Sequence, residues 1–164
     1  MARRLRGFTL MEMMAVIAII SILALMSLPS YLDRIVRQQI ETALPLADIA
    51  KKPVAEWWAA TQTLPPDNAA LLLPTADKIV NNFIDKLTVQ DGTIHITFGN
   101  RAHGAIAGKI LSLRPAVVPD APVVPITWVC GMADAPQKML LQGTNQTSVP
   151  EIYLPLDCRS LKRN

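Results

Sequence analysis

An apolar run near the start of the chain is its strongest constraint. The run extends from Phe8 to Leu28, 21 residues, and holds one charged side chain, Glu12. A helix of about 20 apolar residues spans the hydrocarbon core of a bilayer. A secretory signal peptide would end its apolar region in a small-residue cleavage site, and no such site follows Leu28. We therefore expect a membrane-spanning helix that remains in the mature chain.

Glu12 is an unusual residue for such a helix. A carboxylate there costs roughly 2.5–3.5 kcal/mol even on lenient insertion scales, so it usually has a partner. The nearest cations are arginines that precede Gly7, but a cut after Gly7 would create a new one, the amine of Phe8. An amine at a helix end cannot easily fold back onto its own first turn. We therefore expect the amine of a neighbouring copy to be the partner, which predicts an assembly.

The net positive charge of the chain comes from the residues before the apolar run. The net charge is +3, from 16 basic and 13 acidic residues, and three of the arginines lie in residues 1–7. Without those residues the chain carries 13 basic and 13 acidic side chains. A basic segment before a membrane span favours the cytoplasmic side, which places residues after Leu28 outside. The high overall pI is therefore poor support for nucleic-acid binding.

The segment Gly7-Phe8-Thr9-Leu10-Met11-Glu12 resembles the processing site of type IV pilins and related prepilins. In that family a membrane peptidase removes a short basic leader after the glycine and N-methylates the new first residue. The resemblance implies a cleaved leader at 1–7, a transmembrane and filament-core helix at 8–29, and a periplasmic or extracellular head at 30–164. It also implies cleavage between Gly7 and Phe8, methylation of Phe8, and a role for Glu12 in assembly.

The resemblance further implies the partners of the chain. They are other copies in a filament, the prepilin peptidase and methylase, the inner-membrane pilus assembly platform, and membrane lipid before assembly. The implied location is the inner membrane, with the head in the periplasm, and then the extracellular pilus, or fimbrium.

Beyond the apolar run the pattern predicts an amphipathic helix. Apolar residues recur at spacings of three and four, which is typical of one helical face. We expect one long helix from about residue 8 to about residue 60, with kinks at Pro29, Pro45 and Pro53, the last of which could also divide it. At least one of Trp57 and Trp58 is expected to anchor the core of the head. The apolar positions are Leu32, Val36, Ile40, Ala43, Leu44, Ala47, Ala50, Val54 and Trp57.

The remaining chain predicts an antiparallel sheet. Asp91-Gly92 between alternating runs is a strong hairpin marker, and the alternation places His95 on the outward face. A short helical turn is expected after Asp67-Asn68. The expected strands are 87–90, 93–98, 109–114 (ended by Pro115) and 126–130, and residues 149–154 could add a short edge strand.

The two cysteines favour one disulfide. Cys130 and Cys158 are an even pair in a chain expected to be exported. The flanking segments, 128–130 and 155–159, resemble the two edges of the pilin D-region.

The order of these elements resembles the architecture of type IV pilins. The predicted fold is α+β: the pilin fold, with a long N-terminal helix on a small antiparallel sheet and a disulfide-closed C-terminal loop.

The predicted function is a structural subunit of a type IV pilus that supports adhesion, twitching motility or DNA uptake. No catalytic motif is present, His95 and His103 are expected to be surface residues, and we expect no enzyme activity, cofactor or metal. One alternative is a minor or competence-type DNA-binding pilin, which would need a basic patch. Others are a type II secretion pseudopilin, a class that generally lacks the terminal disulfide, and a signal-anchored periplasmic enzyme. The basic patch would comprise Lys138, Arg159, Lys162 and Arg163.

Overall fold

A computed structural model describes residues 7–160, and of residues 27–30 only the backbone. The chain forms two units, the first ending at Arg34 and the second beginning at Ile35. Helix α1 (Leu10–Ala43) carries the apolar run in the first unit, and its last residues belong to the second. We call residues 35–160 the head.

The head begins with helix that is interrupted once. After α1 come a 3-10 turn (Leu44–Ala47) and helix α2 (Asp48–Thr61). Pro45 occupies the first turn of that 3-10 segment, so the long helix to about residue 60 and the expected irregularity within it at Pro45 are both confirmed. Pro53 lies inside α2 without ending it, so it does not divide the helix.

One face of these helices contributes to the hydrophobic core. Six apolar positions spaced by three and four residues are buried, which confirms the predicted stripe over this range; Leu32 is 51% exposed. Trp57 and Trp58 are only half-buried and lie outside the core cluster, so the expectation that one anchors it is wrong. The stripe ends at Val54, and Trp128, in strand β4 (Thr127–Cys130), packs against the core instead. The buried positions are Val36, Ile40, Ala43, Ala47, Ala50 and Val54.

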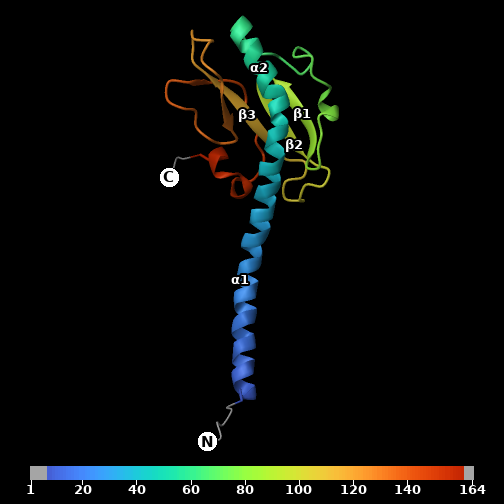
Figure 1. The fold of residues 1–164 in the computed structure, drawn as a ribbon, viewed down its shortest axis with the longest axis vertical. Helices are drawn as coiled ribbons and strands as arrows, with labels where there is room; N and C mark the ends of the chain where they lie inside the picture. The colour runs from blue at the N-terminus through green and yellow to red at the C-terminus, as the bar shows by residue number, and fades with distance from the viewer. Residues whose placement is uncertain (1–6, 161–164) are drawn as a thin grey trace, which may run out of the picture. The chain divides into compact units, whose positions relative to one another are not determined.

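The sheet against these helices is antiparallel, with the order β1-β2-β3-β4 (Figure 1). Asp91 and Gly92 form the predicted two-residue hairpin turn, with φ of 47° and 72°. Positive φ at both central residues is the requirement of a type I′ turn, whose twist matches the flanking strands. The strands are β1 (Ile84–Gln90), β2 (Thr93–Phe98), β3 (Ile110–Val117) and β4 (Thr127–Cys130).

Two strand predictions are wrong. Strand β3 does not stop at Pro115 but continues to Val117, with Pro115 opposite Trp128 in β4. Proline lacks only the donor, and the Pro115 carbonyl still accepts from Gln142 N at 2.9 Å. The expected edge strand at 149–154 is replaced by a 3-10 turn (Glu151–Tyr153) next to Pro150, and the short fifth strand is β5 (Leu140–Leu141), which pairs with β3.

The segment between α2 and β1 is held by the buried side chain of Asn68. Its Oδ1 accepts from Val89 N at 2.6 Å, and its Nδ2 donates to the carbonyl oxygens of Leu87 and Pro74 at 3.1 and 3.3 Å. The predicted turn after Asp67 is present, since Asp67 Oδ1 accepts from Ala70 N. A single amide side chain therefore fastens this loop to β1.

Candidate functional site

Helix α1 begins with a reciprocal cap between Thr9 and Glu12. The Glu12 N–H donates to Thr9 Oγ1 at 3.2 Å, and Thr9 N donates to Glu12 Oε2 at 3.3 Å. This is the Ser/Thr-x-x-Glu capping box, in which each side chain satisfies a backbone donor that has no helical partner. The capping role of Thr9 was not predicted from the sequence, although the Thr-x-x-Glu spacing is visible there.

The cap does not supply a cation to Glu12, and none comes from residues 7–31. Between Gly7 and Tyr31 the chain contains no lysine, arginine or histidine. Within the described residues of the first unit, Glu12 accepts only from Thr9, through contacts of 3.3–3.4 Å that are long for hydrogen bonds to a carboxylate. Its side chain is exposed. Within the described residues, this carboxylate is thus oriented by the cap but is not neutralised by a cation.

Gly7 is not required by the fold of this chain. A methyl group built on it would meet nothing within 4 Å, and its φ is not in the left-handed region. Glycine is needed within a fold where φ is positive or where backbone approaches closely. Neither reason applies at Gly7, so any requirement for glycine here must come from another molecule.

The apolar helix has no cover within its own unit. An 18-residue window of mean hydropathy 2.3 is unburied throughout, and the helix is long and apolar enough to cross a membrane. Large apolar side chains are exposed around the helix, for example Leu10 at 81% and Ile17 at 60%. Ser21 donates to the Ile17 carbonyl at 2.8 Å, so its hydroxyl is satisfied within the helix. A helix that is apolar all round requires lipid or other helices around it.

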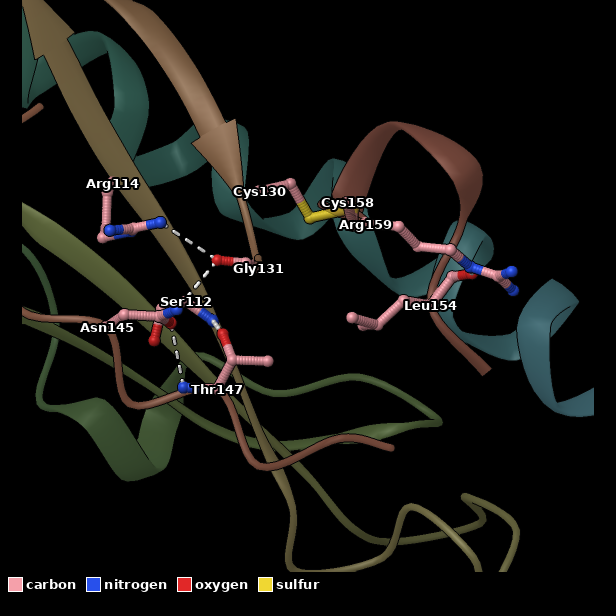
Figure 2. Close-up of a disulfide and its surroundings, with 9 residues drawn as sticks. All are labelled: Ser112, Arg114, Cys130, Gly131, Asn145, Thr147, Leu154, Cys158 and Arg159. Carbon is pink, nitrogen blue, oxygen red and sulfur yellow. Dashed lines mark hydrogen bonds between the residues drawn. A yellow bond between two sulfur atoms is a disulfide. The ribbon is translucent and has the colours of Figure 1, made fainter. Parts of the chain in front are cut away.

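The second candidate site is the disulfide-closed loop of the head. Cys130 and Cys158 form the predicted disulfide, with Cα atoms 4.5 Å apart (Figure 2). Gly131 beside it has φ of 57°, and a Cβ there would lie 2.7 Å from the Cys158 carbonyl oxygen. Met132 N donates to this same oxygen at 2.9 Å. Glycine at 131 therefore permits the close approach of the two loop ends.

Two side chains converge on the Gly131 carbonyl, Asn145 from inside the loop and Arg114 from β3. Asn145 Nδ2 donates to it at 2.9 Å and Arg114 Nη2 at 3.2 Å (Figure 2). Thr147 Oγ1 accepts from Ser112 N, so the loop also pairs with β3. Burial lowers the pKa of Arg114, and Asp134 opposes this shift. The loop is thus fixed at both ends and along β3.

The placement of His95 contradicts the expectation of a surface residue. It is 4% exposed, because residues 142–148 cover the outer face of β2 and β3, and Thr93 and Ser112 beside it are fully buried. Its Nδ1 contacts Ser112 Oγ at 2.9 Å. Alternation identifies a strand but does not reveal a distant segment that covers its polar face.

Burial of His95 predicts a loss of stability in acid. Burial lowers the pKa of the folded imidazole below the 6.5 of an exposed histidine, so the unfolded chain binds more protons. The free energy of unfolding should fall as pH drops below about 6.5, by at most about 1.4 kcal/mol per pH unit from this group. Denaturation at pH 7.5 and 5.0 should show a smaller acid loss in His95→Gln than in the wild type. The exposed His103→Gln is the control, and an equal loss in all three chains would contradict the prediction.

Arg159, a member of the basic patch that a DNA-binding pilin would need, has part of its guanidinium group engaged within the head. It is half-buried, and its Nε and Nη2 donate to the carbonyl oxygens of Leu154 and Ile152, both at 2.9 Å. Lys162 and Arg163, the other terminal members of the proposed basic patch, lie outside the described residues. Among the described residues no group of three or more His, Cys, Asp or Glu could hold a metal ion.

Comparison with known proteins identifies the family. The model of the pilin family, described as a bacterial filament protein, matches residues 36–159, and a prokaryotic N-terminal methylation motif matches residues 2–28. The chain belongs to the pilin family. The resemblance to type IV pilins is thereby confirmed, and with the helix, sheet and disulfide described above the fold is the pilin fold.

Individual relatives agree with this result. The chain is 32% identical over 161 residues to a type IV major pilin protein PilE1 of Neisseria gonorrhoeae, covering 94% of this pilin and 87% of the relative. It is 35% identical over 127 residues to the type IV major pilin protein PilE of the same organism, covering 77% and 74% of the two chains. It is 32% identical over 159 residues to the fimbrial protein EcpC of Eikenella corrodens, covering 94% and 91%. Pilins are structural proteins of filaments.

Proposed function

We propose that this pilin is the structural subunit of a type IV pilus, cleaved between Gly7 and Phe8 and assembled through its apolar helix. The observation that carries the proposal is the uncovered apolar helix directly after an N-terminal methylation motif. Lipid surrounds this helix in the inner membrane, with the head in the periplasm, and other copies surround it in the extracellular filament. Residues 1–7 are then the leader, 8–29 the membrane and filament-core helix, and 30–164 the periplasmic or extracellular domain, which contains the head defined above.

Glu12 sets the register between copies in this proposal. Cleavage exposes the amine of Phe8, which prepilin peptidase methylates, and this amine is the cation that the Glu12 carboxylate of a neighbouring copy lacks. The cap by Thr9 holds the carboxylate in place before assembly. Pairing removes an uncompensated charge from an apolar environment, which favours the assembled state.

The remaining partner and the activities of the filament follow from the same proposal. The inner-membrane assembly platform receives the processed subunit, and the filament supports adhesion, twitching motility or DNA uptake. The disulfide in the head argues against the type II secretion pseudopilin. Nothing in the described residues specifically favours the DNA-binding alternative.

Gly7→Val should block processing. Because the fold has no need for glycine at this position, the substitution acts on the recognition of the cleavage site and leaves the head unchanged. Immunoblots and mass spectrometry of membranes should show only the uncut precursor. The matched control is Gly104→Val, since Gly104 is also exposed and a methyl group built on it would meet nothing within 4 Å, and this variant should be cut normally. Mature-size protein from Gly7→Val would overturn the proposed site.

Deletion of the chain tests the function as a whole. Electron microscopy of the deletion strain should show no pili, and the chain should be the abundant protein in filaments sheared from the wild type. Pili of normal number on the deletion strain would refute the role of structural subunit.

A further inference from the structure

A polar segment of the disulfide-closed loop lies across the outer face of β2 and β3. We call residues 142–148 the strap; they carry neither a charge nor a large apolar side chain. The chain is anchored at both ends of the strap, by β5, which pairs with β3, and by Val149, which is buried in the core. Hydrogen bonds, rather than apolar packing, must therefore hold the strap closed.

The centre of the strap is fastened to the sheet through Ser112. Its Oγ accepts from Gln146 N at 2.9 Å and lies 2.9 Å from His95 Nδ1. Its backbone N donates to Thr147 Oγ1 at 3.1 Å (Figure 2). The hydroxyl that holds the strap is thus also the hydrogen-bond partner of the buried imidazole. A change in the protonation of His95 therefore acts directly on a bond that closes the strap.

Two polar atoms under the strap have no hydrogen-bond partner among the described residues. They are His95 Nε2 and Thr93 Oγ1, and both are buried. Gly143 of the strap lies directly over Thr93, since a Cβ built on this glycine would collide with Thr93 Oγ1. A buried polar atom without a partner costs free energy that contact with water recovers. This cost narrows the difference in free energy between the closed strap and an open one.

A protonated His95 does not fit beneath the closed strap. Both ring nitrogens of a protonated imidazole are donors, so each needs an acceptor. The closed strap provides one acceptor, Ser112 Oγ at Nδ1, which already accepts from Gln146 N, and Nε2 has none. A buried charge whose donors are unpaired is strongly destabilising. The closed strap therefore requires the neutral form of His95, whichever tautomer that form adopts.

The charged groups around His95 do not compensate a charge on it. Those at neighbouring positions of this face are Lys86 of β1 and Arg114 of β3, and both are cations. The carboxylates of Asp85 and Asp91 lie at opposite ends of the β1–β2 pair and are exposed, and the strap has no titratable group. Burial lowers the pKa of His95 accordingly. Acid therefore favours a state in which this imidazole reaches water.

We propose that protonation of His95 opens the strap while the rest of the head stays folded. The open state binds the proton and the closed state does not, so each pH unit below about 6.5 raises the opening equilibrium constant by at most about tenfold. Opening exposes Thr93, His95 and Ser112 and frees backbone groups of β3 that the strap now pairs. The disulfide keeps the loop attached at both ends, so the strap can close again when the pH rises.

Hydrogen exchange of the full chain in detergent micelles at pH 7.5 and 5.0 tests the switch. Protection factors are compared, because the intrinsic exchange rate itself changes with pH. The amide of Val89, bonded to a buried side chain in β1, is the reference and should stay better protected than the strap at both pH values. We expect protection of the amides bonded between strap and sheet to fall about tenfold from pH 7.5 to 5.0. These amides are those of Ile110, Ser112, Gln146 and Ser148.

Two histidine variants assign the change to His95. In His95→Gln the fall in protection should shrink to less than about twofold, because glutamine is polar but takes up no proton in this range. The matched control is His103→Gln, which removes the other, exposed histidine and should keep the wild-type fall. The ratio between the two pH values is the readout, since a loss of packing in the variant lowers protection at both.

Three results would overturn the inference. The first is a fall of less than about threefold in the wild type, which would mean that the closed strap tolerates the proton. The second is a fall above about threefold in His95→Gln, which would assign the pH dependence to another group. The third is equal protection of Val89 and the strap amides, falling together, which would show that His95 takes up its proton only when the whole head unfolds.

Discussion

Glu12→Ala should leave the pilin in the membrane but reduce surface filaments at least about tenfold. Removal of the carboxylate lowers the cost of placing the helix in lipid, so insertion is retained. Assembly would lose the pair between Glu12 and the Phe8 amine of the next copy, and leaving one charge of a buried pair unpaired costs about 3–5 kcal/mol. A tenfold loss corresponds to only about 1.4 kcal/mol. Membrane fractionation and electron microscopy of sheared filaments measure the two effects separately.

Two further variants separate the charge of Glu12 from its capping role. Glutamine at N3 can form the same capping box, so Glu12→Gln keeps the contact with Thr9 and removes only the charge. Thr9→Val removes the cap and keeps the charge. The proposal expects filaments to be lost in Glu12→Gln and retained in Thr9→Val. The reverse pattern would show that helix capping, rather than intermolecular pairing, is the role of Glu12.

Loss of the disulfide should destabilise the head more than any other change predicted here. Cys130→Ala with Cys158→Ala releases a loop that closes over a sequence separation of 28 residues. On the chain-entropy model this lowers the free energy of unfolding by about 3.5 kcal/mol. Chemical denaturation of the full chain in detergent micelles, followed by tryptophan fluorescence, measures the change. Alanine is chosen over serine so that no new hydroxyl group is placed at position 158, which is buried.

The wild-type chain under reducing conditions is the matched control for this pair. It should show nearly the same loss as the double variant, because both lack the crosslink while only one has changed side chains. A loss below about 1 kcal/mol in both would contradict the prediction. It would mean that hydrogen bonds around Gly131 and along β3 hold the loop without the covalent bond.

The features that the sequence predicted well are those set by short spacings. The buried stripe from Val36 to Val54 and the turn at Asp91-Gly92 each follow from local periodicity or local backbone preference. The motif around Gly7 and Glu12 is likewise continuous in sequence. Family membership was therefore accessible before any coordinates, while cleavage, methylation and pairing remain predictions.

The features that were missed depend on distant contacts. His95 lies on the outward face of β2, but residues 142–148 cover that face, and no local pattern reveals them. Pro115 continues β3 because its carbonyl still finds a donor in Gln142. Trp57 and Trp58 are large and apolar, yet the core ends one turn before them. Tertiary context overrode propensity in each case.

The cover over His95 also constrains when the head can complete its folding. Thr93, His95 and Ser112 precede their cover in the chain, because it comes from residues 142–148, and these residues lie in the loop that the disulfide to Cys158 closes. In the proposed export of the head, the polar face of β2 and β3 is open until residues 142–148 have crossed the membrane, and Cys130 has no partner until Cys158 follows. On this proposal the C-terminal side of the head completes its folding last, and residues up to Cys158 must be exported before the surface of the subunit is closed.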